Sequence, residues 1–149
     1  MPAPTLSELL PILQSAVGPV ILISGVGLLL LSMTNRFGRV VDRARTLAGS
    51  YARAGEAERP ALRAQLAVME ERAAVIRRAI MLAAVSVLMA ALLIITIFLA
   101  ALFRLNLGAL VVLFFIVCLA SLIAALLEFL HDLNMSLRAL RMEIKSAER

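Results

Sequence analysis

The chain has 149 residues, of which 62% are hydrophobic, and its mean hydropathy is +0.99. Soluble domains are about 45–50% apolar, so a soluble fold of this size could not bury the excess. The composition therefore predicts an integral membrane protein. The formal net charge of +5 is then best explained by orientation in the membrane and contact with anionic lipid headgroups, and no nucleic-acid partner is expected. The single cysteine, Cys118, excludes a disulfide or a CxxC metal site within one chain.

The first membrane span is predicted at about residues 17–34, starting near Pro19, after a short interfacial helix. Gly18, Gly25 and Ser32 recur at intervals of two helical turns, so they form a stripe of small side chains. In lipid, such a stripe lets another helix approach closely and gain van der Waals contact. We therefore expect tight helix packing along this stripe.

Residues 36–78 predict a cytoplasmic helical hairpin. Apolar residues spaced alternately by three and four positions form a seam on each arm, and charged residues occupy other positions. A polar turn that contains Gly55 and Pro60 separates the arms. The seam residues are Phe37, Val40, Ala44, Leu47 and Tyr51 in the first arm, and Leu62, Leu66, Met69, Ala73, Ile76 and Ile80 in the second.

Two further spans are predicted at about residues 79–103 and 108–130, with a tight turn between them. Small residues at helical spacing again favour close packing in both spans. They are Ala79, Ala83, Ser86 and Ala90 in the second span, and Ala120, Ser121, Ala124 and Ala125 in the third.

The third helix is expected to continue as a C-terminal cytoplasmic helix over about residues 131–147. Its seam consists of Leu126, Leu130, Leu133, Leu137, Leu140 and Ile144. The predicted fold class is therefore all-α. Residues 1–149 are predicted to form a single domain. It is an integral membrane three-helix bundle whose helices extend into a cytoplasmic coiled-coil-like bundle.

The basic residues set the orientation. All fifteen lysines and arginines except Arg104 lie on the side of the hairpin and the C-terminus. Because cytoplasmic loops carry the excess of basic residues, the N-terminus is predicted outside and the C-terminus in the cytoplasm.

Two polar clusters are expected at similar depth at the cytoplasmic boundary. The candidate site residues are Asn35, Arg36, Arg39 and Arg43 at the end of the first span, and Glu128, His131 and Asp132 at the end of the third. In one interpretation the carboxylates pair with Arg36, Arg39 or Arg43 and clamp the third helix against the first, because a carboxylate near hydrocarbon needs such a partner. In a second, Glu128, His131 and Asp132 contribute to a metal site shared between chains. In a third, these groups line an ion pathway in an oligomer.

The sequence contains no phosphate loop, nucleophile elbow or zinc motif. We therefore expect no enzyme, and no catalytic residue, cofactor or metal is assigned. No charged residue lies at mid-membrane, which counts against a pump or an ion-coupled transporter.

The segment Ser32-Met33-Thr34-Asn35-Arg36 ends a leucine-rich span and is followed by Asp42-Arg43-Ala44-Arg45. In these motifs the chain resembles the small bacterial membrane proteins of a domain-of-unknown-function family, DUF2721. The resemblance covers nearly the whole chain. It implies three spans and a multi-pass location in the bacterial inner membrane, and it implies no established activity.

The leading functional hypothesis is an oligomeric structural or interaction module of unknown activity. The first alternative is an oligomeric ion channel. The second is an insertase-like membrane chaperone, because the order of spans and hairpin matches insertases in topology. The expected partners are the lipid bilayer, further copies of the chain and a cytoplasmic protein.

Overall fold

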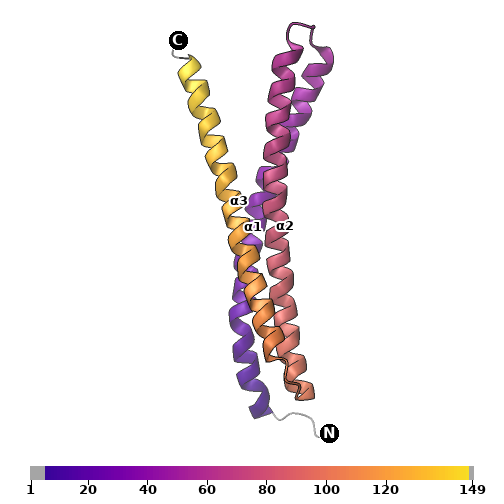
Figure 1. The fold of residues 1–149 in the computed structure, drawn as a ribbon, viewed down its shortest axis with the longest axis vertical. Helices are drawn as coiled ribbons and strands as arrows, with labels where there is room; N and C mark the ends of the chain where they lie inside the picture. Colours follow the sequence, from indigo (N-terminus) through magenta and orange to yellow (C-terminus); the bar gives the residue numbers. More distant parts are fainter. Residues whose placement is uncertain (1–5, 148–149) are drawn as a thin grey trace. The chain divides into compact units, whose positions relative to one another are not determined.

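The computed structural model describes residues 6–147, and within them the side chains of residues 10–136 apart from residue 12. Every regular element in the described residues is an α-helix (Figure 1). The helices are α1 (Leu6–Arg53), α2 (Arg59–Phe103) and α3 (Gly108–Ala147). The all-α fold class is therefore confirmed, whereas a coiled-coil geometry stays a prediction.

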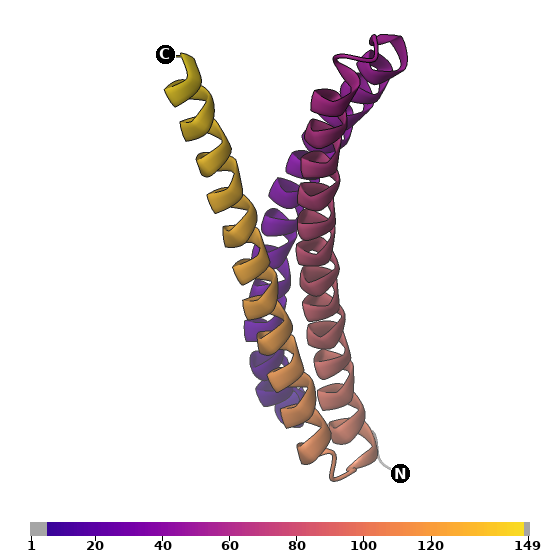
Figure 2. The same ribbon diagram turned by 45° about the horizontal axis from the view of Figure 1, so that its top comes forward.

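Helix α1 continues without a break through Pro11 and Pro19. Figure 2 shows the helices from a second direction. The separate interfacial helix expected before the first span is therefore wrong. Proline removes one backbone donor, but membrane helices tolerate it because local adjustments and neighbouring groups satisfy the freed carbonyl.

The connection between α2 and α3 is a helix cap. Arg104 has a φ of 52°, in the left-handed region, and the amide of Leu105 donates to the carbonyl of Ala100 at 3.0 Å. This six-residue hydrogen bond around a left-handed residue is the Schellman arrangement that ends a helix. The chain therefore reverses within the few residues before Gly108, as the sequence predicted.

The described residues group into two compact units. The first, here called the apolar unit, contains the chain up to Leu30 and Leu82–Ile123. The second, here called the charged unit, contains Leu31–Met81 and the chain from Ala124 onward. In the sequence, the only charged residues that belong to the apolar unit are Glu8 and Arg104.

Small residues of α2 form the core of the apolar unit. Ala83, Ser86 and Ala90 are at most 1% exposed, and Ser86 Oγ lies 3.5 Å from Cys118 Sγ on α3. The close packing predicted for this stripe is confirmed. Small side chains at these positions let α2 and α3 approach closely.

The stripe on α1 behaves differently. Gly18 and Gly25 are exposed, and a Cβ atom built on either would meet nothing within 4 Å. Tight packing through these glycines is therefore wrong within one chain. Val26, which is 2% exposed, takes the inward position instead, because a larger side chain gains more contact there than glycine would.

Large apolar side chains cover the outside of the apolar unit. Ile21 is 66% exposed, Leu28 73% and Ile116 58%. Soluble monomers rarely expose many large apolar side chains together. Since all three helices are also long and apolar enough to cross a bilayer, the chain is a multi-pass membrane protein.

In the charged unit, every predicted seam residue of α1 and α2 is buried or half-buried, with Val40 at 7% and Ile76 at 0% exposure. The seam on α3 is different. Leu130 is 53% exposed, whereas Asp132 is fully buried. The expectation for Leu130 is therefore wrong, because the inward face of α3 is rotated toward Asp132. The side chains of Leu137, Leu140 and Ile144 lie outside the described residues.

Candidate functional site

Asp132 lies on the buried face of α3. It comes two helical turns after Ala125, so both residues point to the same side of the helix, and both are 0% exposed. Among the described side chains, Asp132 is the only buried charged residue. A carboxylate at such a position costs several kcal/mol unless it is paired and hydrogen-bonded.

Two arginines from different helices supply this pairing. Arg36 of α1 places Nη2 3.0 Å from Asp132 Oδ2, and Arg72 of α2 places Nε 3.5 Å from Oδ1. Both arginine side chains are about four-fifths buried, at 22% and 18% exposure. One carboxylate of α3 therefore connects to both of the other helices.

Ser136, one turn after Asp132, completes the network. Its Oγ accepts hydrogen bonds from Arg72 Nη2 at 2.6 Å and from Arg36 Nη2 at 3.2 Å. It donates in turn to the Asp132 backbone carbonyl at 3.0 Å. We call these four residues (Arg36, Arg72, Asp132 and Ser136) the Asp132 clamp.

One oxygen of the clamp is incompletely satisfied. Arg36 lies at ion-pair distance from Asp132 Oδ2, but none of its N–H bonds points at that oxygen. Within the described residues, Oδ2 is thus held by charge attraction and accepts no hydrogen bond. The Arg36 guanidinium also lies over the Phe129 ring, 5.6 Å from its centroid, which adds a cation–π contact.

The other predicted site residues lie outside the clamp. Glu128 lies 4.0 Å from Arg78 of α2, which is 62% exposed. Within the described residues, Glu128 forms no ion pair with an arginine of α1. Asn35 and His131 are exposed. Of the predicted cluster, the structure therefore joins Arg36 to Asp132 and leaves Glu128 in a weak surface pair.

The geometry gives no support to the metal-site interpretation. Within one chain His131 is exposed, whereas Asp132 is buried and already paired with Arg36 and Arg72, and a site shared between chains stays a prediction. No group of three or more His, Cys, Asp and Glu side chains that could hold a metal occurs in the part of the chain that the structure describes.

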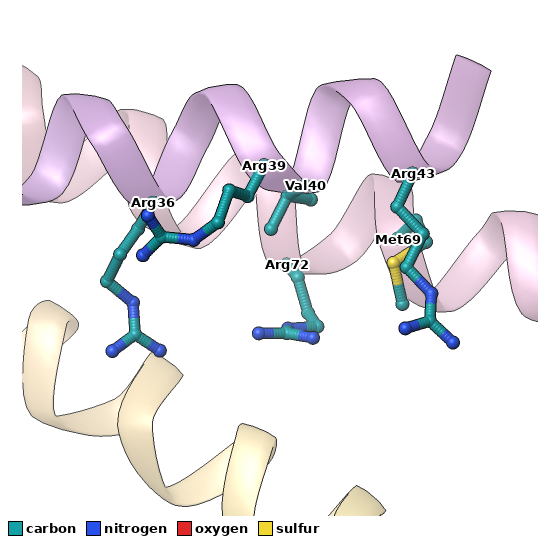
Figure 3. Close-up of a pocket in the computed structure, with 6 residues that line it drawn as sticks. All are labelled: Arg36, Arg39, Val40, Arg43, Met69 and Arg72. Carbon is teal, nitrogen blue, oxygen red and sulfur yellow. The ribbon is translucent and has the colours of Figure 1, made fainter. Parts of the chain in front are cut away.

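A hollow of about 280 Å³ lies beside the clamp in the charged unit, between α1 and α2. Figure 3 shows the four arginines that line it, with Arg36 extending from α1 toward the pale yellow ribbon of α3. We call it the arginine pocket. Its lining residues are Arg36, Arg39, Val40, Arg43, Met69 and Arg72.

Sequence reasoning did not find Arg72, Arg78 and Ser136. A signal for Arg72 is present, since it lies three residues after Met69 and next to Ala73, both on the α2 seam. A residue at that spacing shares the seam face of the helix, so its charge needs a partner.

Three apolar helices and a charged unit held by a buried carboxylate define a multi-pass, three-helix membrane protein. A family model described as a protein of unknown function (DUF2721) matches residues 16–142, and the chain belongs to this family. The match includes all four residues of the clamp and all six that line the arginine pocket. Comparisons with curated proteins and with solved structures found no match.

Proposed function

We propose that the protein is an oligomeric structural or interaction module of the bacterial inner membrane, with its N-terminus outside and its C-terminus in the cytoplasm. The observation that carries this proposal is the Asp132 clamp. Its buried carboxylate is engaged in holding three helices together, with arginines at 3.0 and 3.5 Å. Because this ion pair network fixes the three helices relative to one another in the charged unit, it stabilises a defined surface that a partner can recognise.

The distribution of charge supports the orientation. The charged unit contains every lysine and arginine of the chain except Arg104. Under the positive-inside rule, the basic residues of this unit lie on the cytoplasmic side of the membrane.

The glycines of α1 support self-association. A Cβ atom built on the exposed Gly25 would meet nothing within 4 Å, whereas the exposed Gly18 borders an apolar hollow that residues of α2 and α3 also line. Among the described residues, no helix of the same chain packs closely against either glycine. In lipid, a small-residue stripe of this kind favours contact with another membrane helix, and a second copy of the chain would supply one.

The channel hypothesis has weaker support. Asp132 is 0% exposed and paired, so it does not line an aqueous pathway in this arrangement. We therefore expect the protein to show no ion flux above background when it is reconstituted in liposomes. Steady flux through the wild-type protein would contradict the module proposal and favour a channel.

The mass of the wild-type protein in lipid nanodiscs tests the oligomer. We expect a discrete oligomer, and we expect Gly25→Leu to shift it toward monomer because the added side chain blocks close approach. Gly27→Leu is the matched control, since Gly27 is also open but lies about 160° away around α1, near the opposite face. A monomeric wild-type protein, or equal loss in both variants, would contradict this part of the proposal.

A further inference from the structure

We propose that the arginine pocket is a binding site for a phosphate group carried by a phosphate ester or diester. This inference goes beyond the proposed function and does not depend on the oligomeric state, because every lining residue belongs to one chain.

The first argument is charge. Four guanidinium groups line the pocket, and among the described side chains the only carboxylate that pairs with any of them is Asp132, which is shared by Arg36 and Arg72. Within the described side chains, no carboxylate lies within 4.0 Å of Arg39 or Arg43. The pocket therefore keeps a positive excess, which a multiply charged anion would neutralise.

The second argument is geometry. Arg36, Arg39 and Arg43 recur at i, i+3 and i+7, so they share one face of α1, and Arg72 reaches the same hollow from α2 (Figure 3). Arginine side chains from two helices therefore line the hollow. A guanidinium presents a planar fork of N–H groups that matches two oxygens of a phosphate, so several arginines can bind one tetrahedral group from different sides.

The third argument is the apolar part of the lining. Val40, which is 7% exposed, and the half-buried Met69 lie among the arginines. They form an apolar wall beside the guanidinium groups, which the carbon atoms of an ester group can contact. The volume of about 280 Å³ is several times the roughly 30 Å³ that one water occupies in the liquid. There is thus room for a phosphate and the first atoms of its ester group.

Two sources could supply this phosphate. Arg36 follows the apolar run of α1 by only a few residues, which is the depth at which anionic lipid headgroups meet basic residues. A soluble phosphate ester could reach the same groups from the aqueous side. Both sources present the same phosphate group to the arginines, and the experiment below distinguishes between them.

The test uses the full-length protein in two arms. In detergent without phosphate buffer, isothermal titration calorimetry measures binding of inorganic phosphate and glycerol 3-phosphate. In nanodiscs, native mass spectrometry measures retention of phosphatidylglycerol against phosphatidylcholine. Binding in the first arm alone identifies a soluble phosphate ester, and preferential retention of phosphatidylglycerol identifies a lipid headgroup.

The test variant is the double substitution Arg39→Gln/Arg43→Gln, which leaves the clamp intact. The matched control is Arg45→Gln/Arg77→Gln, which removes the same charge from exposed residues outside the pocket. We expect the test variant to bind at least about tenfold more weakly in the arm that shows binding, and the control to stay within about twofold of wild type.

Thermal unfolding of both variants verifies that they are folded, and the single substitutions Arg39→Gln and Arg43→Gln replace the double variant if it is not. No binding by the wild-type protein in either arm would overturn the proposal. Equal weakening in test and control variants would also overturn it, because it would show attraction to general surface charge.

Discussion

Asp132 shows how a single polar residue can determine which face of a helix is buried. Its carboxylate is 0% exposed and lies between Arg36 and Arg72, which are each about one-fifth exposed. Removing one partner from a buried pair usually costs about 3–5 kcal/mol, because it leaves an uncompensated charge. Loss of one of these three residues is therefore expected to cost more stability than loss of one residue from an exposed ion pair such as Arg45–Asp42.

Ser136 gives a prediction at the same scale. Ser136→Ala removes the acceptor of Arg72 Nη2 at 2.6 Å and of Arg36 Nη2 at 3.2 Å. We expect the free energy of unfolding to fall by about 1–2 kcal/mol, measured by denaturant or thermal unfolding in a fixed detergent. Thr46→Ala is the control, because Thr46 bonds only to its own helix at the exposed carbonyl of Asp42, and we expect a change within about 0.5 kcal/mol. An equal effect of both substitutions would show that the Ser136 contacts add nothing.

The sequence indicated part of this site. The i, i+4 spacing of Glu128 and Asp132 and the arginines after the first span suggested a clamp, and Arg36 does pair with Asp132. The spacing alone did not show that Asp132, and not Glu128, is the buried carboxylate of the clamp. That distinction depends on the rotation of α3, which buries the residue two turns after Ala125 and leaves Glu128 at the edge, 29% exposed.

At the scale of the helices, two small-residue stripes of similar composition have different environments. Ala83, Ser86 and Ala90 of α2 are buried against their own chain, whereas Gly18 and Gly25 of α1 are exposed. Composition predicts that a face can pack closely, but the neighbouring elements decide which face does. The three helices and the two seams of the hairpin could be predicted because they depend on periodicity within one helix.

The α2 stripe gives a testable contrast. Ala83 is 1% exposed, whereas its neighbour Ala84 is exposed. We expect Ala83→Leu to lower the free energy of unfolding by about 1–3 kcal/mol, because the extra carbons do not fit a fully buried position without shifting its neighbours. Ala84→Leu adds the same atoms toward the lipid, and we expect no measurable loss. If thermal unfolding shows the two variants to be equally stable, the stripe does not form the core of the apolar unit.

At the scale of the whole molecule, the compact units coincide with the distribution of charge. The apolar unit presents large apolar side chains such as Leu28 to its surroundings, and the charged unit contains the clamp and the arginine pocket. Hydropathy along the chain predicts this division directly. The clamp and the pocket could not be predicted in the same way, because each joins residues that are far apart in the sequence.

The central claim is that Asp132 holds the helical segments of the charged unit together. Amide hydrogen exchange of the full-length protein in nanodiscs tests it most directly, with Asp132→Asn compared with Glu128→Gln. A loss of about 3 kcal/mol corresponds to roughly hundredfold faster exchange through the opening of the charged unit. We predict this acceleration in residues 31–53, 59–81 and 124–136 together for Asp132→Asn, and none for Glu128→Gln. Faster exchange confined to α3 around residue 132, or no change at all, would contradict the claim.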